Sequence, residues 1–256
     1  MALYVLSRRK HDIVHAQGLL SGLVAVWMKK IFKVKAFVTL LALYEFKEKG
    51  WLFNRVARYI FNNCDIIFVE GDNGKKDIDG LVSGEKVKTF SHWVDQDLFK
   101  PPKERPNDRI RILFVGRPIP EKGRHIIEGA ERLLNNNKYE FTYVENATQE
   151  ELAKHYQRSH ILVVPSLYAE GYVRVIAEGA SCGCVVITSD RGSLPEMVRD
   201  FGLVFGSRSG DLKTFFALTN IFRYLNIWVD KSTDYAKNNF NKRNAEAFLN
   251  GYTNGR

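Results

Sequence analysis

Short apolar runs that alternate with segments of helical character constrain the fold of this chain more than any other feature. The runs are continuous and rich in β-branched and aromatic residues, as in DIIFVE (65–70) and RILFVG (111–116). Such runs are typical of parallel strands covered on both faces. The alternation therefore predicts an α/β fold with doubly wound parallel sheets and right-handed crossovers. We expect strands over residues 12–16, 36–41, 65–70, 87–90, 111–116, 140–144, 160–166, 184–190 and 202–205, and the clearest helices over 19–31, 52–62, 125–135, 150–157 and 174–181.

A break rich in proline and charge, PPKERPNDR (101–109), divides this pattern into two. The β-α order restarts directly after it, and 256 residues suffice for two ordinary domains. Ligands of open α/β sheets bind at the carboxyl ends of the strands, so two facing sheets would place a site in the cleft between them. We expect a first domain over 1–100, a linker over 101–109, a second domain over 110–233, and a C-terminal segment over 234–256 whose helix spans Asp234 to Tyr252 and can cross back to the first domain.

The net charge of +9 points to an anionic partner. Such an excess attracts nucleic acid, phosphorylated small molecules or an anionic membrane face. The aromatic and basic residues form no recognisable nucleic-acid-binding module, so we expect no nucleic acid among the partners.

The cysteine content favours a reducing compartment. Three cysteines at irregular positions, Cys64, Cys182 and Cys184, argue against a disulfide framework. Cys182 and Cys184 are too close together for a usual zinc site, and we expect no bound metal. We see no secretory signal, and the stretch from Leu19 to Met28 is too short to span a bilayer. We therefore expect a cytoplasmic protein.

The stretch ILFVGRPIPEKG (112–123) has the composition of an anion-binding turn after a strand. Gly116 would let the backbone approach a ligand closely. Arg117 can donate two hydrogen bonds to phosphate oxygens, and Lys122 adds a second positive charge. The N-terminus of the following helix adds partial positive charge. This pattern favours diphosphate binding, and the alternative is an ordinary turn with two solvated cations.

The stretch EGYVRVIAEG (170–179) places two glutamates around a mostly apolar segment. Glu170 precedes a helix that starts near Arg174, where a carboxylate can accept hydrogen bonds from sugar hydroxyls and the amides of residues 171–173 can face an anion. Glu178 could hold a ribose diol, as acidic residues do in other nucleotide-binding folds. The alternative is that Glu170 caps the helix and Glu178 is a surface charge. Cations after one strand and carboxylates after another strand of the same sheet together suit a nucleotide sugar.

Three stretches resemble the donor domain of family 4 glycosyltransferases, which have the GT-B fold. They are GRPIPEKG, PSLYAEGYVRVIAEGASCG and CVVITSDRGSLPEMV. The seven residues between Glu170 and Glu178 are the hallmark spacing of that family. HWVDQDLFKP (92–101) resembles its interdomain segment, and DIVHAQGLLSGL (12–23) resembles the late part of its acceptor domain. The resemblance implies two Rossmann-like parallel-sheet domains that face each other across a cleft, with a truncated N-terminal domain in this chain.

The resemblance also implies an activity and roles for individual residues. Such an enzyme is a retaining glycosyltransferase that moves a sugar from a nucleoside-diphosphate sugar to a glycan, lipid-linked or protein acceptor, and it generally needs no divalent metal. Arg117 and Lys122 would neutralise the diphosphate, and Glu178 would hold the ribose. Glu170 would hold hydroxyls of the transferred sugar. The expected donor-binding residues are Gly116, Arg117, Lys122, Glu170, Gly171, Tyr172, Val173, Arg174 and Glu178.

The candidate catalytic residues are Glu170 and His15. His15 ends the run DIVHA (12–16), on the acceptor side of the expected cleft. It could bind the acceptor or support a proton transfer. The alternative is a structural histidine.

The chain also departs from the family pattern. It enters the acceptor domain shortly before DIVHA, Leu41 stands where the family often has a histidine, and Val173 replaces a frequent glycine. A strand, a glycine turn and a helix that usually follow EFTYV (140–144) look absent. Leu41 and the short first domain favour an alternative, a nucleotide-sugar or glycan binding protein without turnover. A sugar-nucleotide epimerase on the same fold is a further alternative.

The segment WMKKIFKVKAF (27–37) mixes aromatic and cationic residues. It could rest on an anionic membrane surface at the inner face, near a lipid-linked acceptor. The alternative is a solvated helix face followed by a buried strand.

Overall fold

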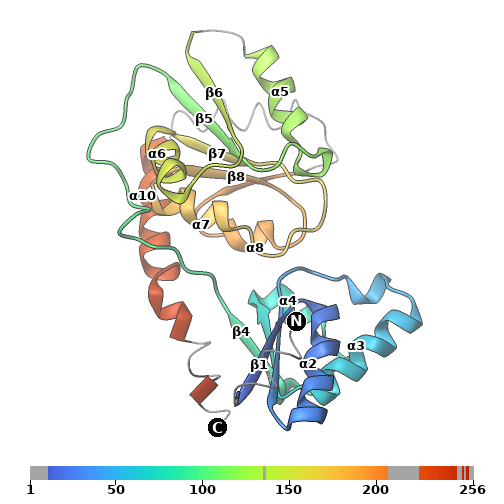
Figure 1. Ribbon diagram of the computed structural model, residues 1–256. Coiled ribbons are helices and arrows are strands. Elements are labelled where there is room, and N and C mark those ends of the chain that lie inside the picture. The colour runs from blue at the N-terminus through green and yellow to red at the C-terminus, as the bar shows by residue number, and fades with distance from the viewer. Residues whose placement is uncertain (1–10, 135–136, 207–224, 247–249, 251, 254–256) are drawn as a thin grey trace. The chain divides into compact units, whose positions relative to one another are not determined.

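The computed structural model describes residues 11–134, 137–206, 225–246, 250, 252 and 253. The chain divides into two compact units: residues 1–91 with 244–256 form the first unit, and residues 92–243 form the second. Each unit contains one parallel β-sheet with helices packed beside it (Figure 1). The predicted fold class, two parallel-sheet α/β domains, is confirmed.

The first unit is built on a four-stranded parallel sheet with the order β1-β2-β3-β4. In β3 the successive residues Ile67, Phe68 and Val69 are fully buried, which requires cover on both faces of the sheet. The elements are β1 (Ile13–Gln17), α2 (Leu19–Phe32), β2 (Lys35–Leu40), η1 (Phe46–Glu48), α3 (Trp51–Asn63), β3 (Ile66–Glu70), α4 (Gly71–Asp77), η2 (Gly84–Lys86) and β4 (Val87–Phe90).

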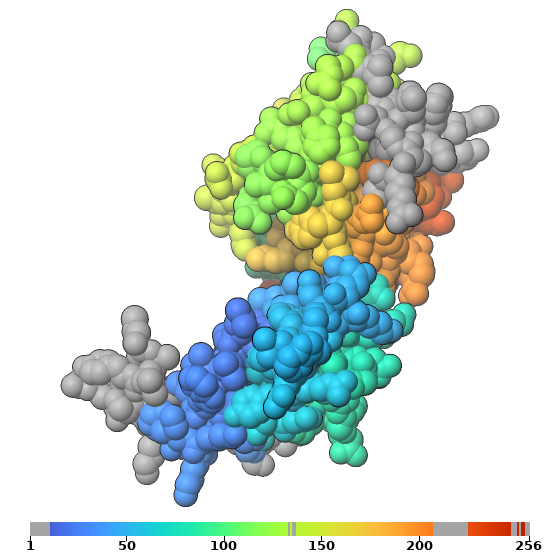
Figure 2. All heavy atoms as spheres, turned by 90° about the vertical axis from the view of Figure 1, so that its right-hand side faces the viewer, coloured from blue at the N-terminus to red at the C-terminus, as the bar shows by residue number. Residues whose placement is uncertain are grey.

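Separate hydrophobic clusters cover the two faces of this sheet. Helices α2 and α3 pack on one face, where Val26 and Ile60 join the buried strand residues. Figure 2 presents these two helices toward the viewer, in blue. On the opposite face, a smaller cluster contains Phe37 and Phe68, with Tyr252 packed against it. Residues close to the C-terminus therefore contribute to the core of the first unit.

The second unit is built on a five-stranded parallel sheet with the order β6-β5-β7-β8-β9. Its elements are β5 (Ile110–Val115), η3 (Pro120–Lys122), α5 (Arg124–Leu133), β6 (Tyr139–Val144), α6 (Gln149–Arg158), β7 (Ile161–Val164), α7 (Arg174–Ser181), β8 (Val185–Ser189), α8 (Leu194–Val198), β9 (Leu203–Phe205) and α10 (Leu225–Asn239). A 3-10 turn, η5 (Lys242–Ala245), follows α10.

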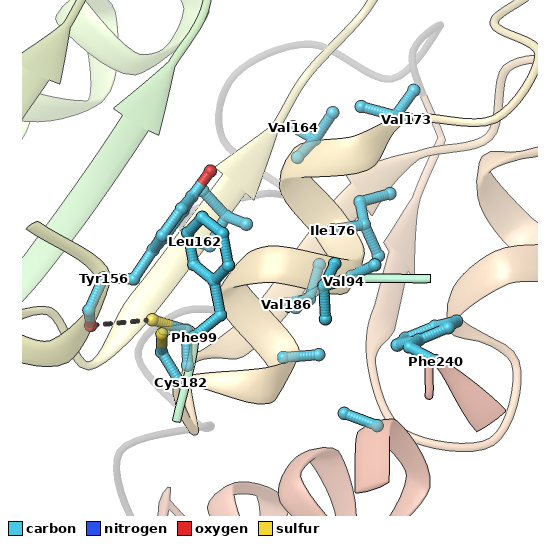
Figure 3. Close-up of a cluster of buried hydrophobic side chains, with 14 of the residues drawn as sticks. Val94, Phe99, Tyr156, Leu162, Val164, Val173, Ile176, Cys182, Val186 and Phe240 are labelled. Atoms are coloured by element: carbon cyan, nitrogen blue, oxygen red, sulfur yellow. Dashed lines mark hydrogen bonds between the residues drawn. The ribbon is translucent and has the colours of Figure 1, made fainter. Parts of the chain in front are cut away.

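Alternate residues of the central strands enter two different clusters. Leu162 and Val164 of β7 belong to one cluster, which also contains Ile176 of α7 and Phe240 (Figure 3). Ile161 and Val163 of the same strand belong to the cluster on the opposite face, which includes Ile127 of α5. Burial on both faces explains why the strand is a continuous apolar run rather than an alternating one.

All nine predicted strands and the five clearest predicted helices are confirmed, with ends that differ by at most two residues. The predicted helix from Asp234 to Tyr252 is wrong in its start and in its continuity, because helical structure stops after α10 and returns at residues 246, 250, 252 and 253. Helix α10 begins at Leu225 and ends at Asn239. Just beyond it, the Asn241 amide donates to the Asn238 carbonyl oxygen (2.8 Å), and its side-chain oxygen accepts from the backbone N–H of Arg243. These local bonds compete with helical ones and favour a stop. Part of the predicted helix, residues 247–249 and 251, lies outside the described residues.

A short connection joins β6 to α6. Residues 145–148 link the two elements directly, and Thr148 and Glu151 form a capping box at the start of α6. The additional strand and helix that the family usually has at this point are not present between them. In the described part of the chain, no helix has the length and apolar character needed to cross a membrane.

Candidate functional site

The two sequence motifs of the second unit meet at the carboxyl edge of its sheet. The segment after β5 and the segment after β7 follow neighbouring strands. Gly123 has a φ of +70°, and a Cβ atom there would lie 2.1 Å from the carbonyl oxygen of Pro165. The backbone N–H of Leu167 donates to the carbonyl oxygen of Glu121 at 2.8 Å. A side chain at position 123 would separate these segments, so glycine is required for the close approach.

This close approach brings Lys122 onto Glu170. The Lys122 Nζ atom donates to Glu170 Oε1 at 2.6 Å. Glu170 Oε1 also accepts from Ser166 Oγ (2.6 Å), and Glu170 Oε2 accepts from the Tyr168 hydroxyl (2.7 Å). Only 6% of the Glu170 surface is exposed. The carboxylate is therefore held in one orientation by three donors, one of them a cation.

Lys122 stays charged in this environment. Burial lowers the pKa of its ammonium group, but the hydrogen bonds to Glu170 and Tyr168 outweigh burial and raise the pKa overall. The Nζ atom also lies 5.2 Å from the centre of the Tyr168 ring. A desolvated, fixed positive charge is suited to an anionic ligand.

The loop after β8 fixes the backbone of Glu170. Gly192 has a φ of +57°, and a Cβ atom there would lie 2.1 Å from the carbonyl oxygen of Glu170. The backbone N–H of Ser193 donates to that same oxygen at 2.9 Å. Gly192 and Ser193 were not among the predicted site residues. The signal for them was the glycine three residues after the strand in CVVITSDRGSLPEMV.

Glu178 is buried, so the interpretation of this residue as a surface charge is wrong. Only 4% of its surface is exposed. The Tyr156 hydroxyl donates to Glu178 Oε2 at 3.0 Å, and Arg174 Nη2 lies 3.3 Å from Oε1. Burial raises the pKa of the Glu178 carboxyl, and Arg174 and the Tyr156 hydrogen bond oppose that rise. Tyr156 is a further residue that the sequence did not predict.

The remaining predicted donor-binding residues lie in the same two segments of the second unit, after β5 and before α7. Gly116 donates its backbone N–H to Val144, and Arg117 after it is exposed. Tyr172 packs against His92, with ring centres 4.2 Å apart. Gly171 precedes it and is partly exposed.

Val173 has a φ of −107°, which a β-branched residue adopts without strain. Its backbone N–H donates to Met197 Sδ at 3.4 Å. Of the three amides predicted to face an anion, the one at Val173 is therefore used within the protein.

The ion pairs of the described residues join Lys122 to Glu170 and Arg174 to Glu178, and none joins Arg117 to either glutamate. The predicted cationic and acidic motifs therefore meet directly through Lys122. Arg117 lies two residues after β5, at the same edge of the sheet, and is exposed.

His15 lies in the first unit, on β1. Its Nε2 atom is 2.6 Å from Thr39 Oγ1, and its Nδ1 atom forms a hydrogen bond with the Tyr252 hydroxyl. Burial lowers the pKa of the imidazole, so the neutral form is favoured near pH 7. Leu41, one residue beyond β2, is half exposed.

Comparison with known proteins points to one family. Residues 88–217, half of the chain, match the family described as Glycosyl transferases group 1. Over 117 residues the chain is 34% identical to D-inositol 3-phosphate glycosyltransferase of Streptomyces bingchenggensis, a match that covers 44% of this chain and 24% of that protein. The matches to curated relatives span between 24% and 64% of the length of those relatives.

Solved structures share the fold over almost the whole chain. Sucrose-phosphate synthase from Thermosynechococcus elongatus superimposes with a TM-score of 0.79 at 20% identity, over 98% of this chain and 75% of that one. Anabaena HepE in complex with UDP and glucose gives a TM-score of 0.82 at 13% identity, over 99% of this chain and 81% of that one.

Proposed function

This chain belongs to the group 1 glycosyltransferases, and on that basis we propose that it transfers a sugar from a nucleoside-diphosphate sugar to an acceptor, with retention of configuration at the anomeric carbon. The observation that carries the proposal is the contact of Lys122 with Glu170 at the carboxyl edge of the second sheet. The contact combines a partly buried cation with an oriented carboxylate. A sugar diphosphate offers a partner to each.

In this proposal Arg117 and Lys122 bind the diphosphate. The leaving group gains negative charge as the glycosidic bond breaks, so fixed cations stabilise the transition state more than the ground state. Lys122 is already positioned and partly desolvated, which reduces the reorganisation that the reaction requires. The two cations take the role that a divalent metal has in other transferases, and we propose that no metal is needed.

Glu170 is proposed to bind hydroxyl groups of the transferred sugar. Its two oxygens accept from Ser166, Tyr168 and Lys122, which leaves lone pairs for further donors. The diphosphate and Glu170 would both bind Lys122. When the diphosphate binds, the Glu170 carboxylate could therefore shift.

Glu178 is proposed to hold the ribose. Its Oε1 partner, the Arg174 side chain, is 57% exposed, so this ion pair can rearrange when a ligand arrives. Gly116, Gly171, Tyr172 and Val173 complete the proposed donor site, in which Val173 acts through its side chain or carbonyl because its N–H is engaged.

His15 is proposed to act on the acceptor side. A neutral imidazole has one donor and one acceptor nitrogen, and its contacts with Thr39 and Tyr252 use both. A proton could pass to the imidazole only if one of these contacts opened. His15 is therefore proposed to orient the acceptor through this network, or to accept a proton after it opens.

The first test is donor binding followed by turnover. A thermal-shift panel of nucleoside diphosphates and sugar nucleotides, including UDP and UDP-glucose, should identify a stabilising ligand, because a ligand that binds only the native state raises its stability. The identified donor is then assayed for release of nucleoside diphosphate with and without EDTA, and NMR of the product gives the anomeric configuration.

A matched pair of variants makes this test specific. Glu170→Gln should abolish turnover and weaken donor binding, whereas Glu150→Gln, an exposed glutamate on α6, should change neither. No shift with any sugar nucleotide in the panel would contradict the proposal.

Leu41 supports a second candidate, a nucleotide-sugar binding protein without turnover. An apolar side chain can neither bind a sugar through hydrogen bonds nor transfer a proton. Thermal stabilisation by a donor with no release of nucleoside diphosphate would favour this candidate.

We also propose a cytoplasmic location at the inner face of an anionic membrane, near a lipid-linked acceptor. The three buried, unpaired cysteines are compatible with a reducing compartment. The basic segment 27–37 supports the peripheral contact.

A further inference from the structure

The outer side of α2 carries a continuous apolar stripe. Leu20, Val24, Trp27 and Ile31 are 47% to 73% exposed. Their spacing of four, three and four residues places them on one face of the helix. The opposite side of α2 supplies Leu19, Val26 and other residues to the core. A single exposed apolar residue is ordinary in a folded protein, but a stripe along a whole helix marks an interaction site.

Helix α3 continues this surface with cations. The Lys30 Nζ atom of α2 donates to the Tyr59 hydroxyl of α3 at 2.8 Å and lies 4.9 Å from the centre of that ring. Arg55 lies one turn before Tyr59, and Arg58 is next to it; both arginines are exposed. The apolar stripe (Leu20, Val24, Trp27 and Ile31) is therefore bordered by a basic group (Lys30, Arg55 and Arg58).

Neither helix contains an aspartate or a glutamate. The acidic residues next to them in sequence are Glu48, before α3, and Asp65, after it. Asp65 forms an ion pair with Lys29 at 2.6 Å. These two helices thus contribute apolar and basic side chains and no acidic ones to this surface.

We propose that α2 and α3 dock on an anionic lipid surface, with the apolar stripe inserted at the boundary between headgroups and acyl chains and the basic group on the headgroups. Tryptophan, leucine and isoleucine on one side with lysine and arginine beside them are the composition of an interfacial helix. A second copy of this chain fits less well. A symmetric contact would bring the same patch of two copies together, and so both basic groups into one interface, with no acid on either helix to neutralise them.

This inference extends the expectation for residues 27–37 in two ways. It moves the apolar contact to the outer side of α2, beginning at Leu20, and it adds α3, which the sequence did not implicate. It does not depend on the transferase activity, because docking is measured without donor or acceptor.

Vesicle flotation of the full chain tests the proposal. The protein should float with vesicles that contain phosphatidylglycerol and phosphatidylcholine, and float much less with phosphatidylcholine alone. Arg55→Gln with Arg58→Gln should weaken partition onto the anionic vesicles about tenfold, because each basic side chain near an anionic surface contributes to binding. Leu20→Ser with Trp27→Ser should weaken it to a similar or larger extent, since it removes inserted apolar area.

Two matched controls lie in the second unit. Ile227→Ser removes an apolar side chain of similar exposure, and Arg199→Gln removes an exposed cation. Both should float as the unchanged protein does, and circular dichroism checks that every variant is folded. Equal flotation with and without phosphatidylglycerol, or equal loss in the control variants, would overturn the proposal. So would a concentration-dependent dimer that Leu20→Ser with Trp27→Ser disrupts in a protein that does not float.

Discussion

The candidate site residues of the two sheets differ in charge. In the second unit, a partly buried lysine and a buried glutamate form an ion pair at the carboxyl edge of the sheet (the ionic edge), and a further buried glutamate lies on α7. In the first unit, the neutral form of His15 is favoured and its ring contacts the hydroxyl groups of Thr39 and Tyr252, while Leu41 beyond β2 is apolar. A buried glutamate, Glu70, ends β3 of that sheet, so the contrast is between the candidate residues and not between the whole edges.

This difference fits the proposed division of labour. A donor brings a diphosphate whose charge increases during the reaction, and it requires fixed charges at the site. An acceptor hydroxyl is neutral and requires hydrogen-bond partners. Variants that remove or add charge at each edge should therefore have effects of very different size.

Removing the cation of the ionic edge should have the largest effect. Lys122→Met deletes a charge that would meet the leaving group, and turnover of the donor should fall by about a hundredfold or more. The change also leaves the Glu170 carboxylate buried without its counter-charge, which should cost about 2 kcal/mol of stability. Steady-state kinetics and urea denaturation measure the two effects.

The double variant separates charge pairing from catalysis. Lys122→Met combined with Glu170→Gln removes both charges, so stability should recover toward that of the unchanged protein while turnover stays low. If Lys122→Met retained normal turnover, the ionic edge would have no role in donor chemistry and the comparison would fail.

The backbone beneath Glu170 gives the second prediction. Gly192→Ala should destabilise the protein by about 3 kcal/mol, because the residue has a positive φ and its Cβ would overlap the Glu170 carbonyl oxygen. Donor binding should weaken as Glu170 moves. Thermal unfolding and ligand-induced shifts measure both effects.

Two other glycines serve as controls for this substitution. Gly80 has a positive φ of +74° with open space around it, so Gly80→Ala should cost only about 1 kcal/mol. Gly84→Ala has neither constraint and should be nearly neutral. Equal costs at all three positions would show that contact with Glu170 does not matter.

The sequence predicted the scaffold well because apolar runs report burial directly. Strands buried on both faces, such as β7 and β8, read as unbroken apolar segments and were placed within two residues. The glutamates and Lys122 were found because they follow those strands. The sequence did not predict the partners that orient them.

Those partners depend on tertiary contacts. Tyr156 reaches Glu178 from α6, and Gly192 reaches Glu170 from the loop after β8. Ser166 and Tyr168 stand within four residues of Glu170, but nothing in their spacing shows that they point at its carboxylate. The break after α10 was missed because the side-chain bonds of Asn241 are not visible in hydrophobic periodicity.

Glu178 gives the third prediction, which concerns how the stability of the protein depends on pH. Because burial raises the pKa of its carboxyl in the folded state, the folded protein binds its proton more tightly than the unfolded chain does. Stability should therefore fall as the pH rises above about 4.3, the usual value for glutamate, and through the raised folded value. Glu178→Gln lacks this titration, so its stability relative to the unchanged protein should improve by about 1 kcal/mol between pH 4 and pH 7.

Urea denaturation at a series of pH values measures this difference, and Glu150→Gln is the control. Tyr156→Phe, in a chain that retains Glu178, should make the fall in stability with rising pH larger, since it removes a hydrogen bond that lowers the Glu178 pKa. The prediction fails if the stability of Glu178→Gln relative to the unchanged protein does not change with pH, or if it rises as the pH falls. Either result would mean that burial does not disfavour the ionised form of Glu178.

His15 should show the smallest effect on stability, with a pH dependence opposite to that of Glu178. Burial lowers the pKa of His15, so below about pH 6.5 the unfolded chain takes up a proton that the folded protein resists, and stability falls as the pH decreases. His15→Gln keeps hydrogen-bonding groups but cannot titrate, so it should lose less stability than the unchanged protein between pH 7 and pH 5, by under about 1 kcal/mol. His125→Gln, on the exposed side of α5, is the control. If His15→Gln lost more stability than the unchanged protein on acidification, the histidine would be favoured in its charged form, and the contrast between His15 and the ion pair of Lys122 with Glu170 would fail.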